Sequence, residues 1–219
     1  MRIGILGGTG PAGRGLALRL AAAGDQPVIG SRDAQRARTV AEGLVEDWPA
    51  HQLSIAGESN EVTAECELVV VATPWDAAVA TVGPLAGALE GKVVVSMANA
   101  LVREGREFNP LVPPRGSIAA SVQAALPGSA VSAAFHHLPA SELARLETPL
   151  IADVLVCSDH PDASVATISL VERIEGLRGV DAGSLGQAAA IEAFTAVLIT
   201  VNLRHKVHAA VRLTGLDDR

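Results

Sequence analysis

The first fifteen residues read MRIGILGGTGPAGRG (1–15), and they are the strongest indication of the fold. The apolar run Arg2 to Leu6 is typical of a buried parallel strand. Gly8, Gly10 and Gly13 follow it in the order GxGxxG and open a segment rich in Leu and Ala. A strand, a glycine turn and a helix begin a dinucleotide-binding fold, where the helix N-terminus holds a pyrophosphate. The alternative is a turn with a structural role only.

Short β-branched runs alternate with helical patterns beyond this turn. That alternation predicts βαβ units and an α/β fold with a doubly wound parallel sheet. The expected strands are Arg2 to Leu6, Pro27 to Gly30, Leu53 to Ala56, Leu68 to Ala72, Lys92 to Ser96 and Ala130 to Ala134.

The pattern changes after Phe135. A surface loop is expected over 108–116, rich in Pro and Gly, and one long helix from Leu185 to about Leu213 with Gly215 as its cap. We therefore expect a Rossmann domain over 1–135 and a smaller, mainly helical domain over 136–219.

Composition excludes several classes of function. The chain has 24 acidic and 17 basic residues, which argues against nucleic acid as a partner. Unbroken apolar stretches are strand-sized, far short of the roughly 20 residues that span a membrane, and the N-terminus lacks the pattern of a signal peptide. We expect a cytoplasmic protein without a membrane anchor. Cys66 and Cys157 stand alone, so no metal site is predicted.

Small side chains dominate the apolar residues. There are 39 Ala but only three Phe, two Trp and no Tyr. The core must therefore be aliphatic, and its helices and strands can approach closely. A tyrosine acid is excluded from any mechanism.

The end of the second expected strand reads Gly30, Ser31, Arg32. An NAD-binding protein normally has Asp or Glu here to hold the ribose 2′-hydroxyl, whereas Asp33 lies where a helix N-cap belongs. Ser31 can donate a hydrogen bond to a 2′-phosphate, and Arg32 and Arg36 can bind it by charge-assisted contacts. This pattern predicts NADP. The alternative is that these arginines only solvate a helix face.

The fourth strand ends in Thr73, Pro74 and Trp75, at the carboxyl edge of the sheet where ligands bind. Trp75 is expected to wall the nicotinamide and its ribose; otherwise it plugs the space between helix and sheet.

Together these motifs resemble the NADPH-dependent reductases of the deazaflavin coenzyme F420 over nearly the whole chain. The glycine turn alone is common to many families, and its combination with the His136 segment and the C-terminal motifs is more specific. The segments that carry the resemblance are ILGGTG (5–10), GLALR (15–19), GSR (30–32), TPW (73–75), AFHHLPA (134–140), DAGSL (181–185), RHKVH (204–208) and RLTG (212–215).

The resemblance implies reversible hydride transfer between nicotinamide C4 and deazaflavin C5, in a cleft between two domains of a cytoplasmic homodimer. Its NADP(H) contacts are then Thr9, Gly10, Pro11, Ala12, Ser31, Arg32, Arg36, Thr73, Trp75, Asn99 and Ala140. Its coenzyme F420 contacts are His136, Leu138 and Ala209. No catalytic acid or base is expected, because two stacked rings exchange hydride directly. His136 would donate a hydrogen bond to a deazaflavin carbonyl.

The chain departs from the family pattern at 96–100, which reads SMANA where a Pro- and Leu-rich turn is usual. Two other functions therefore stay open. One is NADP-dependent reduction of a small keto or imino acid, for which Lys206 with Asn202 is the pair to watch. The other is an NADP(H)-binding sensor without turnover.

Overall fold

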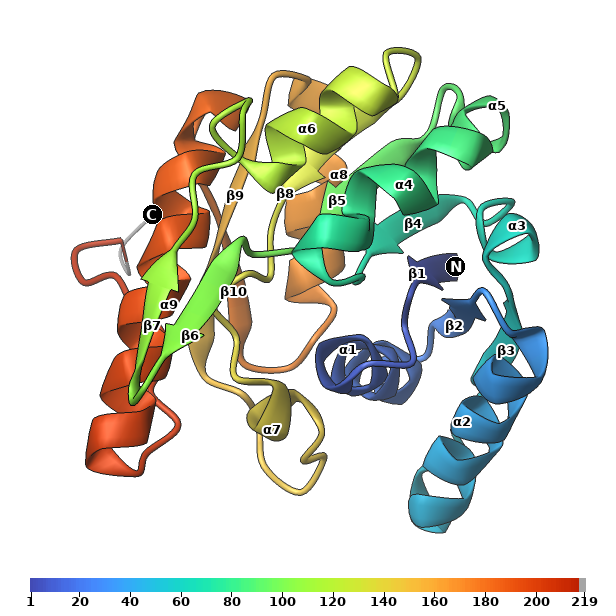
Figure 1. Ribbon diagram of the computed structural model, residues 1–219. Helices are drawn as coiled ribbons and strands as arrows, with labels where there is room; N and C mark the ends of the chain where they lie inside the picture. Colours follow the sequence, from blue (N-terminus) through green and yellow to red (C-terminus); the bar gives the residue numbers. More distant parts are fainter. Residues whose placement is uncertain (217–219) are drawn as a thin grey trace.

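The computed structural model describes residues 1–216 and contains one eight-stranded sheet between layers of helices (Figure 1). The strand order is β10-β9-β8-β5-β4-β1-β2-β3. In that order the strands are Leu177–Asp181, Ala152–Ser158, Ala130–Ala133, Val93–Ser96, Leu68–Val71, Arg2–Leu6, Gln26–Ser31 and Ala56–Ser59. Neighbours pair in parallel except β8 with β9, which are antiparallel. The predicted α/β, mainly parallel Rossmann sheet is confirmed.

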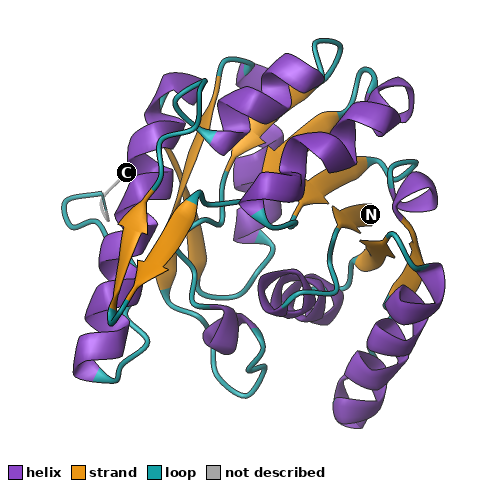
Figure 2. Cartoon of the chain, viewed as in Figure 1, coloured by secondary structure: helices purple, strands orange, loops and turns teal. Residues whose placement is uncertain are grey.

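Helices and a small hairpin complete the chain (Figure 2). The α-helices are α1 Pro11–Ala22, α2 Ala34–Asp47, α3 Asn60–Thr63, α4 Ala78–Val82, α5 Ala86–Leu89, α6 Ile118–Ala125, α7 Ala140–Leu143, α8 Pro161–Glu172 and α9 Ala188–His205. Single 3₁₀ turns occupy Pro49–His51, Trp75–Ala77, Gly83–Leu85 and Leu185–Gln187. The hairpin, β6 Leu101–Glu104 with β7 Glu107–Pro110, packs on α9 through a hydrogen bond from the Phe108 amide to the Thr200 hydroxyl at 3.1 Å.

Alternation along the strands builds a core on each face of the sheet. Ile5 and Val70 pack with residues of α1 and α8, whereas Leu6 and Val71 pack with α4 and α6. The central strands are buried on both faces, so their sequences read as continuous apolar runs. Their side chains are aliphatic, as the composition predicts.

Three predicted boundaries are wrong, and two of them concern strands. The third strand covers Ala56–Ser59 rather than Leu53 to Ala56, because Gln52 turns the chain with φ 49° and Leu53 is buried against Leu18 of α1 instead. The predicted loop 108–116 begins inside β7, because residues 107–110 pair with β6. In both places packing with distant segments decides the strand.

The last helix ends at His205 rather than near Leu213, because Lys206 has the left-handed φ of 54°. Residues 206–213, called the strap below, turn back along the protein. The Asn202 side chain hydrogen-bonds the amide and the carbonyl of Ala209, and the Asp153 amide donates to the Val211 carbonyl at 2.8 Å. These partners replace the helical hydrogen bonds. Ala209 therefore lies in the strap and not on the helix, and Gly215 is not a helix cap.

One segment qualifies as a membrane span by length and composition. Residues Leu185–His205 have a mean hydropathy of 1.4, and 33% of the window is buried. An average of this kind tolerates interspersed polar residues such as Glu192, which a search for unbroken apolar runs does not. Core helices of soluble proteins pass the same test, so it is weak evidence.

Residues on both sides of the predicted domain boundary at 135/136 contribute to one sheet. β9 and β10 extend it beyond β8, and α8 packs on the same face as α1. The division into two domains stays a prediction.

Candidate functional site

A cavity of about 720 Å³ opens at the carboxyl ends of β1, β2 and β4. It is lined by the turn after β1, the start of α2, the start of α3 and the segment after β4. Of the predicted contacts, it brings together Thr9, Gly10, Pro11, Ala12, Ser31, Arg32, Arg36 and Thr73. The carboxyl edge of a doubly wound sheet is where a dinucleotide binds.

The turn before α1 leaves backbone donors and space for a pyrophosphate. α1 has no side-chain cap and no acidic residue in its first turn, so its first N–H groups and its positive end face the cavity. A Cβ added to Gly10 would meet nothing within 4 Å. A Cβ on Gly13 would lie 2.6 Å from Gly8 Cα, so close packing holds the rest of the turn. An anion can therefore approach the backbone at Gly10.

Where the segment after β2 lines the cavity, it carries two exposed arginines, Arg32 and Arg36. The Ser31 hydroxyl accepts a hydrogen bond from the Asp33 amide at 3.1 Å, and the Asp33 carboxylate caps α2 through the amides of Gln35 and Arg36. Asp33 is thus the helix cap that the sequence predicts, and its carboxylate does not replace the missing acid at the end of β2. The site carries cations where a 2′-phosphate belongs.

Asn60 is a functional residue that sequence reasoning missed. Its side-chain oxygen accepts a hydrogen bond from the Gly7 amide at 3.2 Å, and Asn60 also lines the cavity. Asn60 is the first residue of α3 and directly follows β3. The predicted third strand ended at Ala56, four residues before Asn60. A correct β3 boundary would have placed Asn60 at the ligand edge of the sheet.

The predicted contacts of the second coenzyme do not line this cavity. His136 and Leu138 are 4% and 8% exposed, and Ala209 lies in the strap. Three of the predicted NADP(H) contacts, Trp75, Asn99 and Ala140, do not line it either. Trp75 is 38% exposed, so it is no buried plug. On the predicted deazaflavin side, His136 and Leu138 are thus buried and Ala209 is half-buried.

Several buried polar atoms among the predicted contacts and their neighbours have no hydrogen-bond partner within the described chain. They are both ring nitrogens of His136, Nδ1 of His137, Oδ1 of Asn99 and the hydroxyls of Thr73 and Ser96. They follow the ends of β4, β5 and β8, which are neighbours in the sheet. The Asn99 amide nitrogen donates to the His136 carbonyl at 3.0 Å, so these two predicted residues do meet. Buried polar groups without partners are rare away from ligand sites.

Both histidines are neutral at physiological pH. Burial, and then the neighbouring His137, lower the pKa of His136 to about 3, although the carbonyls of Met97 and Ala98 oppose part of that shift. Burial lowers the pKa of His137 to about 4, against the attraction of Asp153. A neutral imidazole offers one donor and one acceptor, which suits hydrogen bonding to an uncharged ring system.

These shifts predict that acidification destabilises the fold. Below about pH 6.5 the unfolded chain binds a proton at each histidine, whereas the folded chain does so only near pH 4 for His137 and pH 3 for His136. The two neutral histidines therefore make their full contribution to the free energy of unfolding above pH 6.5. As the pH drops below this value, each histidine lowers the free energy of unfolding by up to about 1.4 kcal/mol for every pH unit. Urea unfolding at pH 7.5, 6.5 and 5.5 measures it.

Glu192 on α9 supplies the control. Its carboxylate accepts hydrogen bonds from the amides of Ile118 and Ala119, and burial raises its pKa to about 7. It therefore adds stability as the pH falls from 7 toward 4.5, opposing the histidines. Glu192→Gln should steepen the loss between pH 7 and 5 by about 1 kcal/mol per pH unit. Stability that does not change with pH in both proteins would contradict these assignments.

Known proteins resemble this chain over its full length. A family model described as NADP oxidoreductase, coenzyme F420-dependent, matches residues 2–100. F420-dependent NADP reductase of Methanothermobacter marburgensis is 36% identical over 100% of both chains. That of Methanocaldococcus jannaschii is 34% identical over 99% of this chain and 100% of its own. A crystal structure from Arthrobacter sp. FB24, provisionally described as an F420-dependent NADP-reductase, superposes with a TM-score of 0.81 at 24% identity, covering 98% of this chain and 99% of its own.

Proposed function

The chain belongs to the family of coenzyme F420-dependent NADP oxidoreductases, and from this we propose that it transfers hydride reversibly between NADP(H) and coenzyme F420 in the cytoplasm. The observation that carries the proposal is the full-length similarity to F420-dependent NADP reductases. When both are bound, they supply a direct hydride transfer between nicotinamide C4 and deazaflavin C5.

On the NADP side, the chain's own residues bind and orient. The free amides at the start of α1 hold the pyrophosphate beside Gly10, and Ser31, Arg32 and Arg36 hold the 2′-phosphate. Asn60 keeps the turn in place through the Gly7 amide. The cavity fits this dinucleotide because its lining includes backbone donors at the start of α1 and the cationic side chains of Arg32 and Arg36.

On the deazaflavin side, the chain excludes water and tunes polarity. The unpartnered atoms of His136 and Asn99 fit a ring system that both donates and accepts hydrogen bonds. Neutral His136 donates to a ring carbonyl and so stabilises negative charge there without moving a proton. Leu138 and Ala209 on this side, and Ala140 on the NADP(H) side, are small or aliphatic, which lets two flat rings approach each other.

The test is absorbance at 420 nm with purified protein, NADPH and oxidised F420 between pH 5 and 9. We expect NADPH-dependent loss of that absorbance, and the reverse reaction with NADP⁺ and reduced F420. Turnover with small keto or imino acids and none with F420 would favour the first alternative. Tight NADPH binding without any acceptor would favour the sensor.

We also propose that the protein is a homodimer joined through α9 rather than a membrane protein. A groove of about 660 Å³ runs between β7 and α9, and beside it Phe194 and Val197 are 40% and 54% exposed. Exposed apolar side chains along one helix favour a second copy of the same surface.

Val197→Glu should therefore convert a dimer to a monomer at micromolar concentration, because it buries a charge in the interface. Sedimentation velocity measures the change. Val165→Glu is the control, since Val165 is 64% exposed on α8, away from the groove. A wild-type monomer, or loss of the dimer in both variants, would refute this interface.

A further inference from the structure

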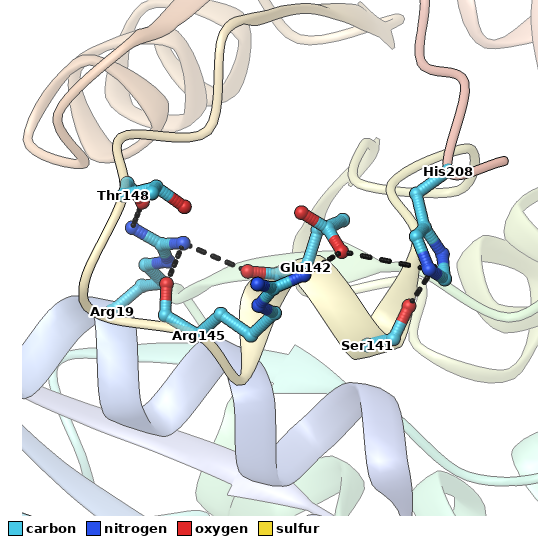
Figure 3. Close-up of polar contacts among 6 residues, drawn as sticks. All are labelled: Arg19, Ser141, Glu142, Arg145, Thr148 and His208. Carbon is cyan, nitrogen blue, oxygen red and sulfur yellow. Dashed lines mark hydrogen bonds and ion pairs between the residues drawn. The ribbon is translucent and has the colours of Figure 1, made fainter.

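Arg19 is a buried arginine on α1 whose hydrogen bonds reach across to α7 (Figure 3). It is 6% exposed, and burial lowers its pKa. Its guanidinium donates to the carbonyls of Glu142 at 2.7 Å, Leu143 at 3.1 Å and Thr148 at 3.0 Å, and also to the carbonyl of Arg145. All four acceptors are backbone oxygens. A cation so buried is held in place by these dipoles.

α7 depends on such a contact because it is a single turn. Residues 140–143 are too few to form a stable helix alone. The amides of Ala144 and Arg145 close the turn by donating to the carbonyls of Ala140 and Glu142 at 3.2 Å each. Gly15 of α1 lets the two helices touch, since a Cβ there would lie 2.6 Å from Leu143 Cβ. Arg19 and Gly15 together set where α7 lies.

The strap contacts α7 from another side. The Ser141 hydroxyl shares a hydrogen bond with His208 Nδ1 at 3.1 Å, and His208 Nε2 lies 3.9 Å from the Glu142 carboxylate (Figure 3). α7 is thereby held between α1, which begins at the pyrophosphate turn, and the strap, which carries Ala209. Ala140 is its first residue and continues the chain from His136.

We infer that Arg19 is a positioning residue for hydride transfer: it fixes α7, and with it Ala140 and the His136 segment, relative to the bound dinucleotide. The inference rests on the proposed function, because it assigns the nicotinamide end to these residues. A small displacement of a positioning element slows transfer between two rings far more than it weakens binding of either.

Two variants displace α7 by different means. Arg19→Lys keeps the charge but loses the planar fork that reaches several carbonyls. Gly15→Ala pushes Leu143 away and removes no polar contact. Their controls are Arg173→Lys, which alters the pair with Asp25 at the end of α8, and Gly43→Ala on α2, whose Cβ would meet nothing within 4 Å. Gly15→Ala and its control Gly43→Ala therefore still test the role of α7 if Arg19→Lys does not fold.

The readouts separate positioning from stability. We expect kcat with F420 to fall roughly 10- to 100-fold in Arg19→Lys and Gly15→Ala, the Kd for NADPH to change less than about threefold, and the deuterium isotope effect from C4-labelled NADPH to rise. Hydrogen exchange should quicken over 140–148 and stay unchanged over 11–14. Both control variants should keep wild-type kcat and isotope effect.

An unchanged kcat and isotope effect per folded molecule in both displacing variants would overturn the inference. So would unchanged exchange over 140–148 in Arg19→Lys. A wild-type protein that does not turn over F420 would instead refute the proposed function, and the exchange measurement would still decide whether Arg19 holds α7.

Discussion

Replacing Arg32 by alanine should weaken NADPH binding by about 10- to 150-fold and leave NADH binding nearly unchanged. Arg32 lines the cavity beside Ser31, at the end of β2 where no carboxylate is present. A hydrogen bond between charged partners contributes about 1.5 to 3 kcal/mol. Losing this contact to the 2′-phosphate therefore corresponds to a change in Kd of about 10- to 150-fold. NADH has no such phosphate. Fluorescence or calorimetric titration with both nucleotides measures the ratio.

Arg38→Ala, on the helix α2 that follows Arg32, is the matched control. Arg38 faces Glu58 at 3.8 Å between exposed side chains and does not line the cavity. Because an exposed ion pair contributes little, this variant should bind NADPH like the wild type. Equal losses for NADPH and NADH in Arg32→Ala would show that the 2′-phosphate binds elsewhere.

Gly10→Ala should weaken NADPH and NADH alike, by about tenfold or more, without unfolding the protein. The added methyl group meets no protein atom, and φ at this residue is −79°, which alanine adopts freely. It projects instead where the pyrophosphate must approach the backbone. The cost to the fold is the poorer N-cap, about 1 kcal/mol. Titration and thermal unfolding of one preparation give both values.

Gly13→Ala, in the same glycine motif, should instead destabilise the fold. Its methyl group would lie 2.6 Å from Gly8 Cα and 2.8 Å from the Gly8 carbonyl oxygen, so backbone must move. We expect a loss of stability of about 2 kcal/mol or more. If Gly10→Ala proves as unstable as Gly13→Ala, the turn itself and not the ligand needs the open space at Gly10.

The dinucleotide half of the site could be predicted because its residues are contiguous. The strand, the glycine turn and α1 succeed one another within 22 residues, and Ser31, Arg32 and the Asp33 cap are adjacent. Local hydrogen bonds and backbone preferences decide such units, so the sequence contains their whole pattern. The same holds for the buried central strands, which are recognisable as apolar runs.

The other half could not be predicted to the same depth. The helix pattern continues past His205, yet Lys206 turns because Asn202 and Asp153 offer the strap its hydrogen bonds. Asn60 reaches the glycine turn only because β3 begins at Ala56. Asp153 and Leu213 are 60 residues apart, and Asn60 and Gly7 are 53 residues apart, so a local periodicity does not record these contacts.

Adjacent residues carry the information that this is a dinucleotide-binding α/β protein with cations in place of the NAD-specific acid, so these properties can be predicted without a structure. The packing of distant segments, in contrast, makes His136 buried and neutral and places the Arg19 guanidinium of α1 against the carbonyls of α7. Burial and long-range hydrogen bonds create both properties. Desolvation depends on which segments cover a side chain, and a carbonyl more than a hundred residues away becomes a partner only when the sheet has brought the two helices together.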